Sequence, residues 1–194
     1  MRITGGRLSG RRVTVPGGAV RPTADRVRES LFARLGDLAG KRVLDLFAGS
    51  GALGFEALSR GATSVVFVDH SPSVLATVRR NAEALGVADA VELRRGEASA
   101  VLGRLAGSAG FDLAFVDPPY ASDRLAAALR ELAAAALLAE GAVVVAESDR
   151  RHPPGAIEGL AAIDERRYGD TLITWFVPRG SATAAVRSQE VSDA

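Results

Sequence analysis

The sequence predicts an α/β fold, with a seven-stranded, mostly parallel sheet, an antiparallel last strand and helices on both faces. Two observations predict it. From residue 41 to residue 147, apolar runs of strand length alternate with helical stretches, a pattern typical of parallel strands joined by crossover helices. Two further apolar runs near the end of the chain are joined by Gly169-Asp170. This dipeptide is typical of tight hairpins, so the seventh strand is expected to pair antiparallel at the end of the sheet.

The elements are expected in a regular order. Strands are predicted near 42–47, 65–69, 91–94, 112–117, 142–147, 163–168 and 172–177, and helices near 53–60, 72–85, 97–106 and 123–138. The alanine-rich residues 126–136 belong to the last helix because alanine is the strongest helix former. Before the first strand, Thr23 is expected to cap a helix in which Val27, Leu31 and Leu35 recur every four residues.

Length and composition indicate one domain with short extensions. The 194 residues are 47% hydrophobic with a mean hydropathy of +0.13, enough to bury one core. We expect a β-hairpin extension in residues 1–20, the main domain in residues 21–180 and a tail without apolar periodicity in residues 181–194. The chain has no cysteine and two distant histidines, so no metal site is expected. No segment resembles a membrane span or signal peptide, which favours a cytoplasmic protein, and nothing in the sequence suggests more than a monomer.

Positive charge is concentrated at the amino-terminal end. Residues 1–30 hold seven arginines and two acids, a net charge of +5, whereas the remainder carries −4. This end is therefore a candidate phosphate-contacting surface. The alternative is a solvated face in a chain that uses arginine for nearly all its basic residues. The candidate contacts are Arg2, Arg7, Arg11, Arg12, Arg21, Arg26 and Arg28.

The motif Asp117-Pro118-Pro119-Tyr120 follows the apolar run 113–116 and so lies at the carboxyl end of a strand, where α/β sheets bind ligands. Two prolines stiffen this turn and remove two backbone donors. Asp117 and the Pro118 carbonyl could accept both hydrogens of an exocyclic amine while Tyr120 stacks on its ring. Such acceptors localise the nitrogen lone pair for attack. The alternative is a stiffened turn whose Asp caps the next helix.

A glycine-rich turn follows the strand predicted at 42–47. Its Gly49-x-Gly51-x-x-Gly54 pattern fits the dinucleotide fingerprint, and Asp69, 18 residues after Gly51, would take a ribose diol. A nicotinamide enzyme is therefore a competing interpretation. However, Asp45 lies in the strand just before the turn, where a carboxylate disfavours a pyrophosphate and favours a cationic ligand.

S-adenosylmethionine carries an ammonium, a sulfonium, a ribose diol and an adenine, and three acids fall near successive strand ends. Asp45 would meet the amino-acid end, Asp69 the ribose hydroxyls and Glu97 the adenine amine. The alternatives are that Asp69 caps a helix and that Glu97 is a solvated loop acid. The candidate cofactor-binding residues are Asp45, Phe47, Ala48, Gly49, Ser50, Gly51, Asp69, His70, Glu97 and Ala98, with His70 included by proximity alone.

Further motifs carry a family resemblance over nearly the whole chain. They are Arg2-Ile3-Thr4-Gly5-Gly6 with Gly10-Arg11, the segments 21–32, 45–54 and 56–62, and Phe115-Val116-Asp117-Pro118-Pro119-Tyr120. With these motifs the chain resembles the Rossmann-like class I methyltransferases, specifically the bacterial 16S rRNA guanine-N2 methyltransferases of the RsmD type. Some members of that family carry Phe where this chain has Tyr120, and both rings stack.

The resemblance implies S-adenosylmethionine as the methyl donor and the N2 amine of one guanine in 16S rRNA as the acceptor, within the 30S subunit or its assembly intermediate. It makes Asp117, Pro118, Pro119 and Tyr120 the catalytic residues, which hold a flipped base during direct methyl transfer. It also makes the amino-terminal arginines RNA-binding, with Arg26 and Arg28 nearest the substrate. For these two arginines the alternative is an intrahelical pair with Glu29.

Other functions remain open from the residues alone. The same turn would serve an N-methyltransferase acting on another RNA, on DNA adenine or on a protein glutamine. Nicotinamide redox chemistry would use the same glycine pattern, and a catalytically silent RNA-binding protein would share the basic end. The intact Asp117 and Gly49–Gly51 turn disfavour a silent binder.

Overall fold

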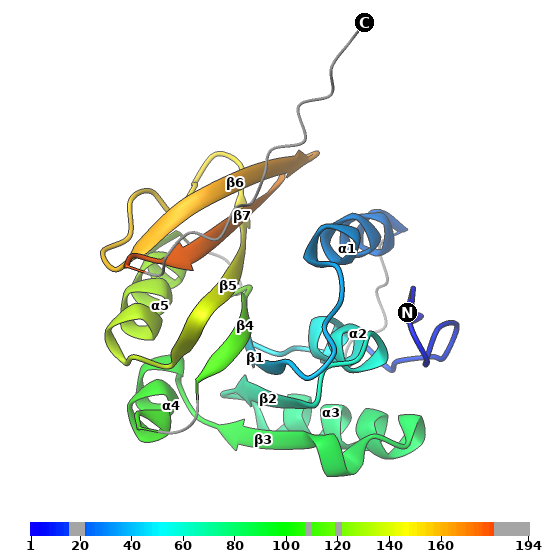
Figure 1. Ribbon diagram of the computed structural model, residues 1–194. Coiled ribbons are helices and arrows are strands. Elements are labelled where there is room, and N and C mark those ends of the chain that lie inside the picture. The colour runs from blue at the N-terminus through cyan, green and yellow to red at the C-terminus, as the bar shows by residue number, and fades with distance from the viewer. Residues whose placement is uncertain (16–21, 108–109, 119–121, 181–194) are drawn as a thin grey trace, which may run out of the picture.

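The computed structural model describes residues 1–15, 22–107, 110–118 and 122–180, which form a single seven-stranded sheet flanked by helices (Figure 1). The helices are α1 (Pro22–Leu35), α2 (Ala52–Ser59), α3 (Pro72–Leu85), α4 (Ala98–Leu105) and α5 (Ser122–Ala134), with a 3-10 turn at Ala88–Ala90. The strands are β1 (Arg42–Leu46), β2 (Ser64–Asp69), β3 (Val91–Arg95), β4 (Phe111–Val116), β5 (Leu138–Asp149), β6 (Leu160–Tyr168) and β7 (Thr171–Pro178). The predicted α/β class is confirmed.

The strand order is β3-β2-β1-β4-β5-β7-β6, with the first five strands parallel and β7 antiparallel to both its neighbours. The last strand is antiparallel as predicted, but it lies between β5 and β6 rather than at the edge. Residues Leu172–Phe176 of β7 are all buried, whereas β6 is largely exposed or half-buried. The more apolar strand of the hairpin therefore takes the inner position.

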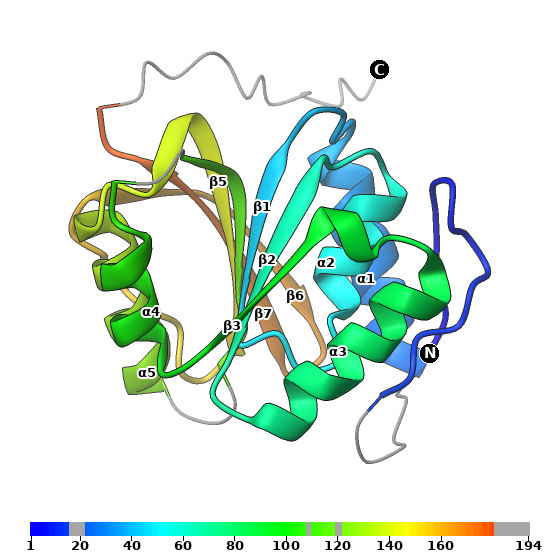
Figure 2. The same ribbon diagram turned by 90° about the horizontal axis from the view of Figure 1, so that it is seen from below.

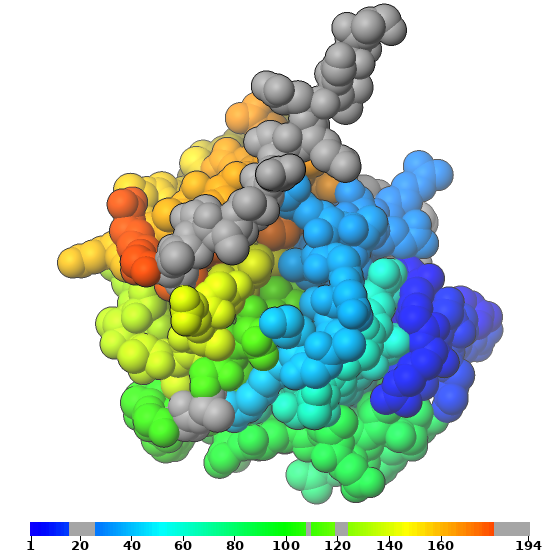
Figure 3. Space-filling model, in the orientation of Figure 1, coloured from blue at the N-terminus to red at the C-terminus, as the bar shows by residue number. Residues whose placement is uncertain are grey.

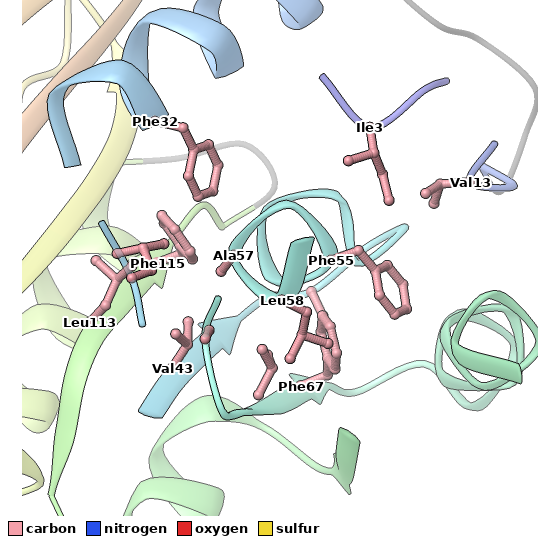
Figure 4. Packing of buried hydrophobic residues seen from close by; sticks show 14 of the residues in the cluster. Ile3, Val13, Phe32, Val43, Phe55, Ala57, Leu58, Phe67, Leu113 and Phe115 are labelled. Carbon is pink, nitrogen blue, oxygen red and sulfur yellow. The ribbon is translucent and has the colours of Figure 1, made fainter. Parts of the chain in front are cut away.

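The sheet separates two cores. Figure 1 and Figure 2 show α1, α2 and α3 on one face and α4 and α5 on the other. Successive strand residues face opposite sides, so Val43 packs with the helices of the first face and Leu44 with those of the second. Figure 4 shows the first core, where the Phe32 and Phe115 rings lie 5.6 Å apart between their centroids. The two buried cores hold the strands, and hence their carboxyl ends, in fixed register.

Two helix boundaries differ from the prediction by more than one residue. Helix α1 begins at Pro22, so Thr23 lies inside the helix rather than capping it, in keeping with the preference of proline for the first helical turn. Helix α5 ends at Ala134, and Ala136 has a left-handed φ of 50° before β5 begins at Leu138. The helix propensity of the alanine-rich segment is overridden here, because the chain must turn at residues 135–137 to enter β5.

The amino-terminal residues 1–15 form a short ribbon, called here the N-terminal ribbon. Its two arms pair antiparallel through the bridge of Arg2 with Arg12 and through the hydrogen bond from the Ile3 N–H to the Arg11 carbonyl at 3.0 Å, without extending into two regular strands. Its apolar side chains Ile3, Leu8 and Val13 are buried in the first core, which holds the ribbon against the body of the molecule; Figure 4 shows Ile3 and Val13 there. In the space-filling view the ribbon (dark blue) lies beside the cyan residues of α2 (Figure 3). The ribbon is therefore packed on α2.

Glu56 of α2 binds this ribbon through hydrogen bonds. Its side chain is fully buried and accepts hydrogen bonds from the Thr4 N–H at 2.9 Å, the Thr4 hydroxyl at 2.7 Å and the Gly5 N–H at 2.9 Å. Arg28 of α1 and Arg60 also donate to it, at 3.3 and 3.0 Å. A buried carboxylate is tolerated only when it is paired and hydrogen-bonded, so Glu56 joins the ribbon, α1 and α2 into one unit.

No helix among the described residues is long and apolar enough to cross a membrane.

Candidate functional site

Three carboxylates gather at the carboxyl edge of the parallel strands. Asp45 of β1 is in register with Phe67 of β2 and with Phe115 of β4. Residues two apart on a strand share a face, so Asp69 and Asp117, which follow these phenylalanines by two positions, point to the same side as Asp45. This side is the one covered by α1, α2 and α3. The sheet therefore brings together three acids that are 24 to 72 residues apart in the sequence.

The glycine-rich turn between β1 and α2 is tightly bound to β2. The N–H groups of Phe47 and Ala48 donate to the Val68 carbonyl at 3.0 and 2.9 Å. Phe47 and Gly51 both have a left-handed φ, of 69° and 77°. A Cβ on Gly54 would lie 2.3 Å from the Phe67 ring, so only glycine lets α2 approach the strand this closely.

Asp45 is buried beneath this turn, with 3% of its surface exposed. Its Oδ2 accepts from the Gly54 N–H at 3.0 Å, near the amino-terminal end of α2. Burial raises the pKa of Asp45 to about 7; the Gly54 hydrogen bond opposes the rise, and the Asp69 charge adds to it. A dinucleotide pyrophosphate needs the helix N-terminus for itself, so Asp45 disfavours the nicotinamide interpretation. A cationic ligand would instead stabilise the Asp45 carboxylate.

Asp69 connects two turns at the edge. Its Oδ2 accepts from the Gly49 N–H at 3.3 Å and its Oδ1 from the Ser71 N–H at 2.8 Å. The cap of α3 is Ser71, whose hydroxyl accepts from the Val74 N–H, so the alternative of Asp69 as the helix cap is wrong. The exposed His70 ring lies 3.5 Å from the Asp69 carboxylate. A carboxylate has about four acceptor positions, which leaves Asp69 capacity for hydroxyl donors.

Gly96, Glu97 and Ala98 follow β3 and continue the same edge. The Gly96 N–H donates to the Asp69 carbonyl at 3.1 Å, and Gly96 has a φ of 150°. Glu97 takes the N-cap position of α4, but its exposed side chain makes no capping hydrogen bond. The segment therefore lies next to the ribose-binding candidate, while a contact between Glu97 and adenine stays a prediction.

Asp117 lies directly after β4 and is exposed. Surrounding protein atoms raise the pKa of its carboxyl group well above the usual value, and the charges of Glu147 and Asp45 raise it further. Water reaches the side chain and screens part of this effect. The half-buried Pro118 follows it, whereas Pro119 and Tyr120 lie outside the described residues. The site thus presents a carboxylate that holds its proton more tightly than an ordinary aspartate.

Glu147 of β5 was not predicted as a site residue. Val116 and Ala146 are in register on β4 and β5, so Glu147 and Asp117, which follow them, are neighbours on one face. Burial also raises the pKa of Glu147. A signal for it exists in the sequence, because Glu147, like Asp117, directly follows an apolar run. That run is Ala142-Val143-Val144-Val145-Ala146.

Comparisons with known proteins agree with this geometry. The family described as Conserved hypothetical protein 95 matches residues 1–177. YlbH of Bacillus subtilis (strain 168) is 38% identical over 184 residues, which cover 93% of this chain and 100% of the relative. The ribosomal RNA small subunit methyltransferase D of Escherichia coli (strain K12) is 34% identical over 151 residues, which cover 77% of this chain and 75% of the relative. The chain belongs to the RsmD-type family of rRNA methyltransferases.

A solved structure supports the same assignment. That of yhhF from Escherichia coli superposes with a TM-score of 0.80 at 29% identity, covering 91% of this chain and 96% of the other. This RsmD-type chain therefore has the fold of the class I methyltransferases.

The predicted RNA-contacting arginines of this RsmD-type protein divide into two groups. Arg2, Arg7, Arg11, Arg12 and Arg26 are exposed. Two of them also support the ribbon, because Arg2 donates to the Gly10 carbonyl at 2.7 Å and Arg11 to the Ala84 carbonyl at 2.5 Å. Arg21 lies outside the described residues.

Arg28 does not fit the prediction that it contacts RNA. It has 4% of its surface exposed and donates to the Glu56 carboxylate at 3.3 Å and to the Arg2 carbonyl at 2.6 Å. The alternative of an intrahelical pair with Glu29 is also replaced by this pairing with Glu56. Arg28 thus holds the N-terminal ribbon to α1 and is buried.

Within the described ranges, no group of three or more His, Cys, Asp or Glu side chains could hold a metal ion.

Proposed function

We propose that this RsmD-type methyltransferase transfers a methyl group from S-adenosylmethionine to the exocyclic N2 amine of a guanine in 16S rRNA of the small ribosomal subunit. One observation carries the proposal. Asp117, the candidate hydrogen-bond acceptor for the guanine amine, lies on the same face and edge of the sheet as Asp45 and Asp69, the acids that are candidates for binding the cofactor. The name of the Escherichia coli relative, a small subunit rRNA methyltransferase, supports the choice of substrate.

The acids of the site fit S-adenosylmethionine. Asp45 is buried and holds its proton up to about pH 7, so the ammonium group of a ligand would lower its cost of ionisation. Asp69 would accept the ribose hydroxyls, and Glu97 with Ala98 would border the adenine. Phe47, Ala48, Gly49, Ser50, Gly51 and His70 would line the remainder. S-adenosylmethionine supplies the methyl group, attached to a positively charged sulfur.

Asp117 and the Pro118 carbonyl would accept the two hydrogens of the guanine amine and hold its nitrogen ready for attack. The base leaves its stack for this, at least cost in an exposed RNA loop. Pro119 would stiffen the turn and Tyr120 would stack on the base. Because its pKa is raised, Asp117 is also a suitable acceptor for the proton that the nitrogen loses after methylation. No covalent enzyme intermediate is needed.

The exposed arginines at the amino-terminal end, with Arg21, would contact RNA phosphates. Such contacts position the substrate without reading its sequence. The acceptor is presented in the 30S subunit or an assembly intermediate, and the enzyme acts as a monomer in the cytoplasm.

The test is methyl transfer from radiolabelled S-adenosylmethionine to 30S particles that lack the modification, to naked 16S RNA and to DNA, with the product nucleoside identified. We expect N2-methylguanosine in the particles. Label in another RNA, in N6-methyladenosine of DNA or in protein would show that the methyl acceptor belongs to that class of molecule instead. Cofactor binding without transfer to any RNA would overturn the ribosomal assignment.

A further inference from the structure

Asn81 of α3 joins two parts of the molecule that have separate roles in the proposed function. It is buried, with 3% of its surface exposed. Its Oδ1 accepts from the Thr14 N–H at 2.9 Å, and its Nδ2 donates to the Thr14 carbonyl at 2.9 Å and to the Ser50 carbonyl at 3.2 Å. Thr14 belongs to the N-terminal ribbon, and Ser50 belongs to the glycine-rich turn.

The chemistry of these three hydrogen bonds requires an amide. One partner is an N–H and the other two are carbonyls, so the side chain must accept once and donate twice. Aspartate would offer no donor and would place a charge among carbonyl oxygens, and leucine would fill the volume without any hydrogen bond. Asn81 is the only asparagine of the chain.

The hydrogen bond to Ser50 fixes one peptide group of the glycine-rich turn, called here the cofactor turn. The carbonyl of the Ser50–Gly51 peptide is held by Asn81, while its N–H, on Gly51, donates to the Ala48 carbonyl at 2.7 Å. The flanking glycines, Gly49 and Gly51, have left-handed φ values of 53° and 77°, and glycine visits many other conformations at little cost. A peptide held at both ends keeps this flexible turn in one arrangement.

We propose that Asn81 is a positioning residue that sets the cofactor turn and anchors it to the N-terminal ribbon. The inference rests on the proposed function only in naming the turn's ligand as S-adenosylmethionine. Its structural content is that the turn and the ribbon share one buried anchor. Loss of this anchor therefore loosens both together, and the affinity for S-adenosylmethionine falls even though Asn81 need not touch it.

The experiment compares Asn81→Leu and Asn81→Asp with a matched control, Ser59→Ala. Ser59 of α2 is another buried residue that holds the ribbon: its hydroxyl donates to the Gly5 carbonyl and accepts from the Leu8 N–H at 2.9 Å. It lies at the opposite end of α2 from the glycine-rich turn. The readouts are amide hydrogen exchange of residues 47–55 and of the ribbon, the Kd for S-adenosylmethionine by calorimetry, and the thermal midpoint.

We expect both Asn81 variants to exchange faster in the turn and in the ribbon, and to bind S-adenosylmethionine about fivefold more weakly, the loss of about one hydrogen bond. Ser59→Ala should accelerate exchange in the ribbon alone and leave the Kd unchanged at a similar thermal midpoint. Unchanged turn exchange in Asn81→Leu, or an equal loss of cofactor affinity in Ser59→Ala, would overturn the inference. If the unmodified protein fails to bind S-adenosylmethionine, the proposed function falls, and hydrogen exchange still decides the role of Asn81.

Discussion

At the scale of single residues, the site concentrates acids that oppose each other's ionisation. Burial and the Asp69 charge raise the pKa of Asp45, surrounding protein atoms and the charges of Glu147 and Asp45 raise that of Asp117, and burial raises that of Glu147. Such an arrangement costs folding free energy, because the unfolded chain ionises these groups freely. Groups that are costly for stability and gathered at a sheet edge are typical of a functional site.

Replacing Asp45 by asparagine should stabilise the protein above pH 7. The pKa of Asp45 is raised from 3.8 to about 7 in the folded state. Asp45 therefore lowers the free energy of unfolding increasingly as the pH rises from about 4 to 7, and this loss of stability reaches its full size above pH 7. The change corresponds to about 4 kcal/mol at most. Asparagine keeps an oxygen for the Gly54 N–H.

Denaturant unfolding of Asp45→Asn and the unmodified protein at pH 4 and pH 8 measures this effect. The gain in unfolding free energy should appear at pH 8 and nearly vanish at pH 4, while affinity for S-adenosylmethionine falls. Equal stability at both pH values would mean that Asp45 ionises normally in the folded protein.

Replacing Asp117 by alanine should abolish methyl transfer and spare cofactor binding. The variant loses the acceptor that orients the amine, a loss of at least about a hundredfold in single-turnover rate. Asp112→Ala is the matched control, because Asp112 lies at the opposite end of β4 and bonds the Arg42 N–H and Lys41. Retained transfer in Asp117→Ala near the unmodified rate would refute the assigned role.

At the scale of elements, helix α2 carries the glycine-rich turn at its start, and Gly54 decides how close it lies to β2. A Cβ at position 54 would meet the Phe67 ring at 2.3 Å and a Val65 methyl at 2.8 Å. Both neighbours are fully buried, so neither can move without disturbing the core. The position of the glycine-rich turn therefore depends on the absence of a side chain at Gly54.

Gly54→Ala should destabilise the protein by about 1–3 kcal/mol through overpacking, although alanine favours helices. Gly103→Ala in α4 is the control: nothing lies within 4 Å of the added Cβ, and we expect a gain of about 0.5–1 kcal/mol. Denaturant unfolding compares the two variants. Similar changes in both would show that helix propensity, and not contact with Phe67, governs position 54.

At the scale of the whole molecule, the first 30 residues and the remainder of the chain carry net charges of opposite sign. Residues 1–30 carry +5 and the remainder carries −4. Within that basic end, Arg28 is committed to Glu56, while Arg7 and Arg12 are exposed on the ribbon. The ribbon thus offers positive charge and is joined through Asn81 to the glycine-rich turn, an arrangement that would suit a phosphate backbone beside the proposed amine-binding residues.

Arg7→Ala and Arg12→Ala should each weaken RNA binding and lower the slope of log affinity against log salt by about 0.7–0.9, if each side chain contacts one phosphate. Arg130→Ala is the control, because Arg130 is exposed on α5, which covers the opposite face of the sheet. Titrations of RNA at several salt concentrations give the slopes. A slope that falls equally in Arg130→Ala would indicate only a general charge effect.

The sequence predicts much of this molecule because the relevant signals are local. Alternating apolar runs and helical periodicity place each element to within a few residues. The rule that ligands bind at strand ends selects Asp45, Asp69 and Asp117 from the residue pattern alone. The place of the last strand at the edge of the sheet is predicted wrongly. Which strand of the hairpin lies inside depends on burial, and Leu172–Phe176 are buried only once β7 packs beside β5.

What the sequence by itself determined is the class of fold, the candidate acids and the family to which the chain belongs. Only the tertiary structure shows that Arg28, predicted to contact RNA, pairs with Glu56. It also shows that Glu147 lies beside Asp117 and that Asn81 is hydrogen-bonded to both Thr14 and Ser50. The physical reason is the same in each case. Hydrogen bonds and charge pairs between segments 28 to 67 residues apart leave no periodic trace in the chain, since they exist only once packing brings those segments together.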